Sequence, residues 1–236
     1  LFNLKTQVSS IFVYDDQSTD GSREIAQRFT DYVVTRGSDI PTFMEHEGRF
    51  RQDSWKKFQE VVKPVLGDWI ITVDSDEFLI MDDSDEPSDV AGYLDYITTI
   101  ADMRHRIQVV FHRPEVWSSG WTSNPVGVEV MDVPSIRVDG LWNRIWAGRL
   151  FKYFPDGVIP DKAMGCGNEP TYVSTGLKSH LGTYRGNIRD QRLKMLHVGY
   201  LNDTDVVEKY QRYSTLMDHG HNNHHIQSIV AAPALE

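Results

Sequence analysis

A short apolar run that ends in two carboxylates constrains the fold of this chain more than any other feature. Residues 67–80 read GDWIITVDSDEFLI, so the apolar stretch at 70–73 leads directly into Asp74, Ser75 and Asp76. Such a run is typical of a strand buried on both faces of a parallel sheet. Open α/β sheets bind their ligands outside the carboxyl ends of these strands. The run therefore predicts an α/β domain with a polar site at this strand end.

The two aspartates at the strand end indicate a cation. Asp74 and Asp76 would repel each other and lose hydration unless a positive ion lay between them. We expect a divalent metal that bridges both carboxylates and a nucleotide diphosphate. The same residues also fit a second interpretation, in which one Asp caps a helix and the other is a solvated turn residue.

Strand and helix patterns alternate through the first half of the chain. Apolar runs predict strands at residues 10–14, 31–35, 70–73 and 107–111, and helical periodicity predicts helices at 22–29, 48–66 and 88–101. This order predicts an α/β fold with a mostly parallel, doubly wound sheet flanked by helices. Residues rich in Gly, Pro, Trp and Arg follow, with short strands expected at 126–131 and 149–154 and a helix at 204–217. We expect one domain over residues 1–203 and a helix with a peripheral tail over 204–236.

Composition excludes several classes of partner. The net charge of −10 over 236 residues argues against nucleic acid or an anionic membrane as the main partner. The single cysteine, Cys166, excludes an internal disulfide framework and a thiolate metal cluster. No segment reaches the roughly 20 apolar residues of a transmembrane helix, and no signal peptide is visible, so we expect a cytoplasmic protein. The chain begins at Leu1, which is compatible with a trimmed N-terminus.

A second motif, DDQSTDGS, directly follows the first predicted strand. Its Asp16, Ser18, Asp20 and Gly21 fit the first positions of an EF-hand loop, but the closing Glu is replaced by Gln27, which excludes a calcium loop of that type. The motif is better interpreted as a turn before a helix. Asp20 or Ser18 would cap the helix, and Gly21 would permit a tight bend. The Asp16 carboxylate is then expected to be free for ribose hydroxyls or a base N–H.

Taken together, VYDDQSTDGS and GDWIITVDSDEFL resemble the family 2 glycosyltransferases. The first motif of that family has the form VDDGSTDGT, and its second is a strand followed by Asp-x-Asp; the resemblance covers about residues 8–112. It implies a GT-A fold, with a nucleotide-sugar half at 1–112 and an acceptor-facing half at 113–203. It also implies metal-dependent transfer of a sugar from a nucleotide-diphosphate sugar, with UDP-sugar as the expected donor, to a hydroxyl of a glycan, protein or small molecule. The family's usual first strand, with its Asn-Glu pair, does not precede Leu1. Either the sequence is truncated there, which we expect, or the base is held differently.

The resemblance assigns roles to individual residues of this chain. Asp16 would contact the nucleoside, with Asp20 supporting its loop, while Asp74, Ser75 and Asp76 would face the diphosphate and its Mn²⁺ or Mg²⁺. Asp76 would be the more direct metal ligand. The bound metal would act as a Lewis acid on the departing nucleoside diphosphate.

A histidine late in the chain is a third candidate ligand. His197 lies in the apolar run LKMLHVGY and is similar to a late His that completes the metal site of several GT-A enzymes. A neutral imidazole suits Mn²⁺. The alternative is a core histidine that is hydrogen-bonded to a backbone carbonyl.

Further candidates would bind the diphosphate or activate the acceptor. Arg51 and Arg149 are expected to clamp the diphosphate, although a salt-bridged surface role fits most arginines of the chain. An inverting enzyme needs a carboxylate base at the acceptor hydroxyl, and Glu169 in a Gly-rich segment is our candidate. Three other carboxylates compete with it: Glu129, Asp156 and Asp161.

Two other functions fit parts of the pattern. A non-catalytic module that binds sugar nucleotides or glycans, derived from a decayed transferase, would keep the same motifs. A haloacid dehalogenase-type phosphatase also begins with a strand and Asp-x-Asp, but Phe78 stands where that class carries Thr or Val, and the motif lies after two βα units. Nucleoside diphosphate release with and without Mn²⁺ distinguishes these alternatives.

Overall fold

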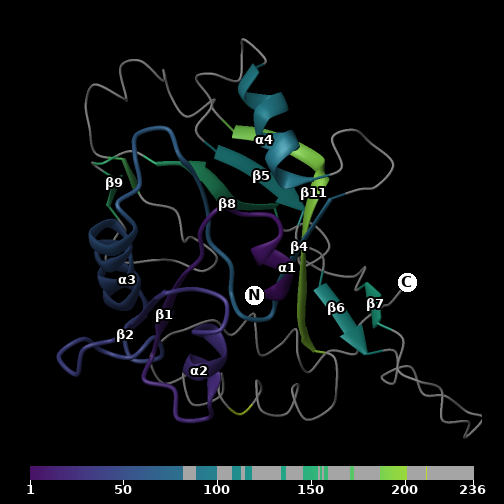
Figure 1. Ribbon diagram of the computed structural model, residues 1–236. Helices are drawn as coiled ribbons and strands as arrows, with labels where there is room; N and C mark the ends of the chain where they lie inside the picture. Colours follow the sequence, from purple (N-terminus) through teal and green to yellow (C-terminus); the bar gives the residue numbers. More distant parts are fainter. Residues whose placement is uncertain are drawn as a thin grey trace, which may run out of the picture. The chain divides into compact units, whose positions relative to one another are not determined.

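The structure is a computed structural model of the chain (Figure 1). It describes residues 1–81, 89–99, 108–112, 115–118, 134–136, 146–153, 155, 157–158, 171–172, 187–200 and 211. The expected strand at 126–131 lies outside these residues, and so does the expected helix at 204–217 apart from Gln211.

The described chain forms fifteen helices and strands. Four are helices: α1 (Phe2–Lys5), α2 (Ser22–Ala26), α3 (Glu47–Val62) and α4 (Val90–Thr99). The strands are β1 (Phe12–Asp15), β2 (Tyr32–Thr35), β3 (Trp69–Ile71), β4 (Glu77–Met81), β5 (Gln108–His112), β6 (Glu115–Ser118), β7 (Pro134–Ile136), β8 (Trp146–Lys152), β9 (Gly157–Val158), β10 (Thr171–Tyr172) and β11 (Asn187–Tyr200). No helix among the described residues is both long enough and apolar enough to span a bilayer.

The chain divides into two compact units. The first contains Leu1–Val73, Met81–Phe111 and Ala147–Leu193, and the second contains Asp74–Ile80, His112–Trp146 and Lys194–Glu236. The boundary falls directly before Asp74, so the strand that precedes the Asp-x-Asp triplet and the triplet itself belong to different units.

In the first unit, β1 and β2 form a parallel pair that packs against α3 (Figure 1). Alternate residues of β1 point toward the helix, as the period of a strand requires. The ring of Phe12 meets Phe58 edge to face at 5.7 Å between centroids, and Tyr14 meets Phe50 in the same way at 5.0 Å. The strands predicted at 10–14 and 31–35 are therefore confirmed, each within two residues at its ends.

Helix α3 is shorter than the sequence predicted, since it ends at Val62 and not near residue 66. The His46 ring caps its first turn, because Nδ1 accepts the Arg49 N–H at 3.3 Å. At the other end Lys63 adopts a left-handed conformation with φ of 54°, and Pro64 follows. A left-handed residue ends the helical hydrogen-bond pattern, and a residue before proline is disfavoured in the α region.

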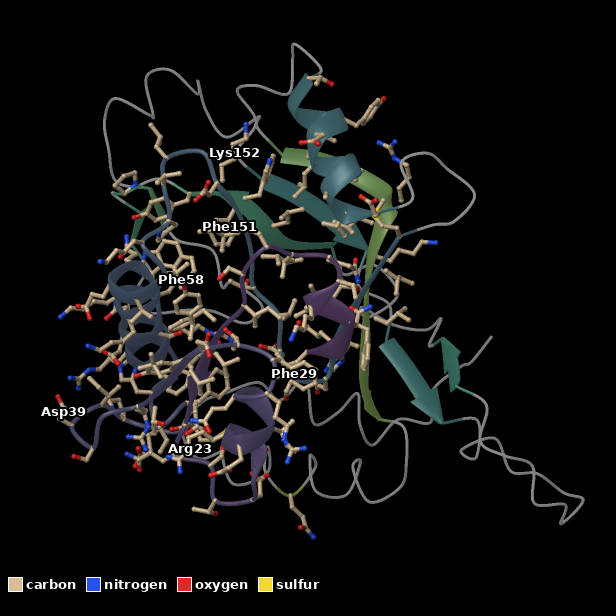
Figure 2. All side chains as sticks on the ribbon, in the orientation of Figure 1. Arg23, Phe29, Asp39, Phe58, Phe151 and Lys152 are labelled. Carbon is tan, nitrogen blue, oxygen red and sulfur yellow. The ribbon has the colours of Figure 1, made fainter. Side chains whose placement is uncertain are left out.

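An aromatic cluster forms part of the core of the first unit. Trp55 from α3 packs with Phe151 and Tyr153 from the β8 segment, and Phe58 and Ile70 border this group. Phe58 and Phe151 are labelled in Figure 2. Full burial of one such side chain contributes roughly 1.5–3 kcal/mol, so this cluster is a main source of the stability that joins α3 to β3 and β8.

Strand β3 contains part of the apolar run that precedes Asp74, but its surroundings differ from those predicted. It pairs antiparallel with β8, with Ile70 opposite Phe151. All three of its residues are half-buried, so β3 is not a strand covered on both faces. Strand β5 lies between β8 and β11 in the strand order, and β9 and β10 form a separate antiparallel pair.

In the second unit, β4 pairs with β11, and β11 also pairs in parallel with β6, which pairs antiparallel with β7. Figure 1 shows β4 beside the second part of β11. Strand β4 was not predicted from the sequence, because its five residues directly follow the aspartates and no turn signal separates them from the preceding apolar run. Glu77 and Leu79 are buried on one side of it and Phe78 is exposed on the other.

The predicted GT-A fold, with a mostly parallel, doubly wound sheet, is wrong for the described residues. Three of the five strand pairings whose register is described are antiparallel, and the parallel pair β1–β2 forms a sheet of its own. The prediction assumed that consecutive strands become parallel neighbours, whereas β3 pairs with β8, some eighty residues later in the chain. An apolar run indicates a buried strand, but it does not specify the direction or identity of the partner strand.

Candidate functional site

The Asp-x-Asp triplet lies in a tight turn between Asp74 and Glu77. The backbone N–H of Glu77 donates to the carbonyl of Asp74 at 3.1 Å, which closes the turn. In return the backbone N–H of Asp74 donates to Oε2 of the Glu77 side chain at 2.8 Å. Ser75 is exposed at the tip of the turn, and Asp76 is half-buried. Two reciprocal hydrogen bonds therefore fix the backbone that carries both aspartates.

The structure brings Asp76 together with His197, two residues that the sequence predicted as metal ligands, and the ligand role itself stays a prediction. Nε2 of His197 lies 3.2 Å from Oδ2 of Asp76, although 121 residues separate them in the chain. Both belong to the second unit, and His197 lies on β11 opposite Glu115 of β6. Only 7% of the histidine is exposed, whereas 31% of the Asp76 side chain is. His197 is thus held in place by β11, and the Asp76 carboxylate is partly exposed.

The donor atoms of this pair are of a kind that divalent metal ions bind. Two ligands in neighbouring octahedral positions at about 2.1 Å from an ion would stand about 3 Å apart, close to the observed separation. Among the described residues no group of three His, Cys, Asp or Glu side chains converges on one point. Mg²⁺ is commonly held by one or two carboxylates plus substrate phosphates. A carboxylate and an imidazole therefore fit an ion whose remaining ligands come from the substrate and water.

Asp16 lies in the first unit, at the end of β1, and its carboxylate is not free. Oδ1 accepts a hydrogen bond from Nε of Arg36, and Oδ2 accepts the backbone N–H of Phe43 at 3.0 Å. The carboxylate joins the end of β1 to the loop that follows β2. Its contact with a nucleoside stays a prediction, and the side chain is 31% exposed.

The predicted cap of α2 by Asp20 or Ser18 is wrong, because Gly21 is the N-cap and has no side-chain cap, but Asp20 holds the residue next to it. Oδ1 of Asp20 accepts the Ser22 N–H at 3.0 Å, next to Gly21, whose φ of 86° is a left-handed conformation favoured by glycine. The hydrogen bonds from Ser22 lower the pKa of the fully exposed Asp20 carboxyl. Asp20 thus supports the loop that follows β1.

The structure says little about the residues predicted to clamp the diphosphate or to act as the catalytic base. Arg51 forms an ion pair with Glu47 at 2.7 Å and lies over the Phe43 ring at 5.0 Å from its centroid. Arg149 lies in β8, but its side chain is not among those described, and Glu169 lies outside the described residues. The roles proposed for these three residues stay predictions.

Sequence reasoning missed two residues that organise these loops. Glu77 follows Asp74 by three residues, the spacing of a reciprocal pairing between side chain and backbone, so a signal was present. Arg36, with 8% of its surface exposed, follows β2 as a single basic residue and carried no comparable signal. Its importance arises from contacts with Asp16, which lies twenty residues earlier in the chain.

No family model matches the chain, and no curated protein matches its sequence.

Proposed function

We propose that this protein transfers a sugar from a nucleotide-diphosphate sugar to an acceptor hydroxyl, with Mn²⁺ or Mg²⁺ as cofactor. The observation that supports this most is the 3.2 Å approach of His197 Nε2 to Asp76 Oδ2 at the turn of the Asp-x-Asp triplet. A buried imidazole beside a half-exposed carboxylate is a donor set suited to these ions.

In this proposal Asp76 and His197 hold the ion, and Asp74 lies in the same closed turn. A divalent ion held there would supply Lewis-acid stabilisation of the charge on the departing nucleoside diphosphate. The Asp76 carboxylate offsets part of the charge of the ion, and neutral His197 binds through a ring nitrogen without adding charge. Such charge compensation matters for a chain with a net charge of −10, which otherwise repels a diphosphate.

Asp16 belongs to the first unit, and its predicted contact with a nucleoside is a separate part of the proposal from the ion site. Each carboxylate oxygen accepts more than one hydrogen bond, so the bonds from Arg36 and Phe43 leave capacity for a ribose hydroxyl. The bonds from Arg36 and Phe43 also hold the carboxylate in one orientation, which reduces the entropy lost on binding.

The decisive experiment measures nucleoside diphosphate release from a panel of UDP- and GDP-sugars, with and without Mn²⁺. The wild-type protein is expected to release the diphosphate only with the metal. Asp76→Asn and His197→Ala should each reduce release by more than about 100-fold, because outer-shell substitutions alone cost about 10–100-fold. Asp95→Asn, an exposed carboxylate on α4, is the matched control and should leave release unchanged.

Two results would count against this function. Release that is independent of Mn²⁺, or that survives Asp76→Asn, would refute the metal site. Sugar-nucleotide binding without any turnover would instead identify a binding module.

A further inference from the structure

Glu77 is a buried carboxylate next to the candidate metal ligands. Only 6% of its surface is exposed, and charged side chains are rarely buried to this extent without a specific partner. One partner is the backbone N–H of Asp74, which donates to Oε2 at 2.8 Å. The Glu77 side chain therefore holds the backbone of Asp74, the first residue of the Asp-x-Asp triplet, by a hydrogen bond.

The strand that carries Glu77 explains why it can hold the turn rigidly. Glu77 is the first residue of β4, and it lies on the same side as Leu79, which is fully buried. Glu77 begins a strand that pairs with β11, the strand that carries His197. The Asp74 N–H is thus attached through Glu77 to the element that supplies the second ligand.

We propose that Glu77 is a positioning residue for the metal and diphosphate site of Asp76 and His197, an inference that rests on the function proposed above. Its side chain closes the turn on one side while the bond from its own N–H to the Asp74 carbonyl closes it on the other. This double closure restricts the backbone at Ser75 and Asp76 and keeps the Asp76 carboxylate beside His197. Groups that orient metal ligands in this way strongly affect metal affinity without touching the ion.

Two substitutions separate positioning from a direct role of the carboxylate charge. Glu77→Gln keeps an acceptor oxygen at the same reach but removes the charge. Glu77→Asp keeps the charge but shortens the side chain by one methylene, so that it no longer reaches the Asp74 N–H. Binding of Mn²⁺ in the presence of UDP is measured from the electron paramagnetic resonance signal of the free ion.

The expected result is that Glu77→Gln binds Mn²⁺ within about threefold of the wild type, whereas Glu77→Asp binds about 10–100-fold more weakly. Hydrogen exchange of the Asp74 amide provides a readout that does not depend on the metal. This amide should be protected in the wild type and in Glu77→Gln, and should exchange rapidly in Glu77→Asp. Leu79→Ala, on the same side of β4, is the control; it should lower stability while the folded protein keeps wild-type affinity.

Equal affinity of Glu77→Asp and the wild type would overturn the positioning role. Equal losses in Glu77→Gln and Glu77→Asp would overturn it as well, because the charge itself would then matter. In both cases the wild type still binds Mn²⁺ and the proposed function stands. A wild-type protein that does not bind Mn²⁺ with UDP would instead refute the proposed function, and this role with it.

Discussion

The carboxylate of Asp16 and the guanidinium of Arg36 join the ends of the parallel strands β1 and β2. Nε of Arg36 donates to Asp16, and its Nη1 donates to the carbonyls of Gly37 and Ile40 in the following loop. The Arg36 side chain is 7% exposed. The buried Arg36 guanidinium therefore connects the loop that follows β1 to the loop that follows β2.

Replacing Arg36 by Ala should destabilise the protein by about 2–3 kcal/mol. Removal of one partner of a fully buried pair costs about 3–5 kcal/mol, and the partly exposed Asp16 lowers this figure. Urea denaturation followed by circular dichroism measures the change. Arg23→Ala is the matched control, because the exposed pair of Arg23 and Glu24 should contribute less than about 1 kcal/mol. Equal effects of the two substitutions would contradict a structural role for Arg36.

Tyr14→Phe should lower stability at pH 7 by about 1–2 kcal/mol, because the Tyr14 hydroxyl donates to the Asp53 carboxylate. The same contact predicts a dependence on alkaline pH. Burial, followed by the hydrogen bond to Asp53, raises the pKa of Tyr14 well above its ordinary value of 10.0. The folded state therefore keeps the proton after the unfolded state has lost it, so the contribution to stability is complete below pH 10 and declines as the pH rises above it.

The pH effect is measured as the difference between the urea midpoints of the wild type and Tyr14→Phe from pH 9 to 11.5. This comparison is needed because the chain contains 10 tyrosines, and the others titrate equally in both proteins. The advantage of the wild type should shrink above pH 10. A constant difference across the range would show that the Tyr14 hydroxyl does not hold its proton in the folded state.

Phe151→Ala should destabilise the protein by about 3–5 kcal/mol, the usual cost of removing a buried aromatic ring. Phe151 is 2% exposed and its ring lies 6.1 Å from that of Trp55, so tryptophan fluorescence should change as well. Leu66→Ala removes an apolar side chain that is 67% exposed, and should change stability by less than about 0.5 kcal/mol. Similar losses for the two variants would argue against this core.

Two substitutions in the turn between α3 and β3 should have opposite effects. Lys63→Gly should stabilise the protein by about 0.5 kcal/mol, because glycine removes the cost of the left-handed conformation at φ 54°. Gly67→Ala should destabilise it by about 1–2 kcal/mol, because φ is 94° there, a conformation that alanine disfavours. The new methyl group would meet nothing within 4 Å, so a steric clash adds nothing to this cost. The cost is therefore conformational, and thermal denaturation of the two variants tests its sign. Destabilisation by Lys63→Gly would show that the Lys63 side chain contributes more than its backbone conformation costs.

Local patterns predicted the individual elements of this chain better than their assembly. The alternation of side chains in β1 and the helical periodicity of α3 could be predicted from the sequence, because both depend on neighbours a few residues apart. The strand that pairs with β3 could not be predicted from the sequence, because pairing with β8 depends on packing against side chains some eighty residues away. The free carboxylate expected at Asp16 was wrong for the same reason, since Arg36 carried no local signal.

The sequence by itself determined that carboxylates follow an apolar strand at Asp74 and Asp76, and it suggested His197 as their partner. Only the tertiary structure decided that Asp76 and His197 lie 3.2 Å apart. It also decided that Glu77 holds the intervening turn from a buried position on β4. The physical reason is that residue chemistry and short-range periodicity depend only on the local sequence. Strand direction and the burial of a charge depend on packing against residues far along the chain.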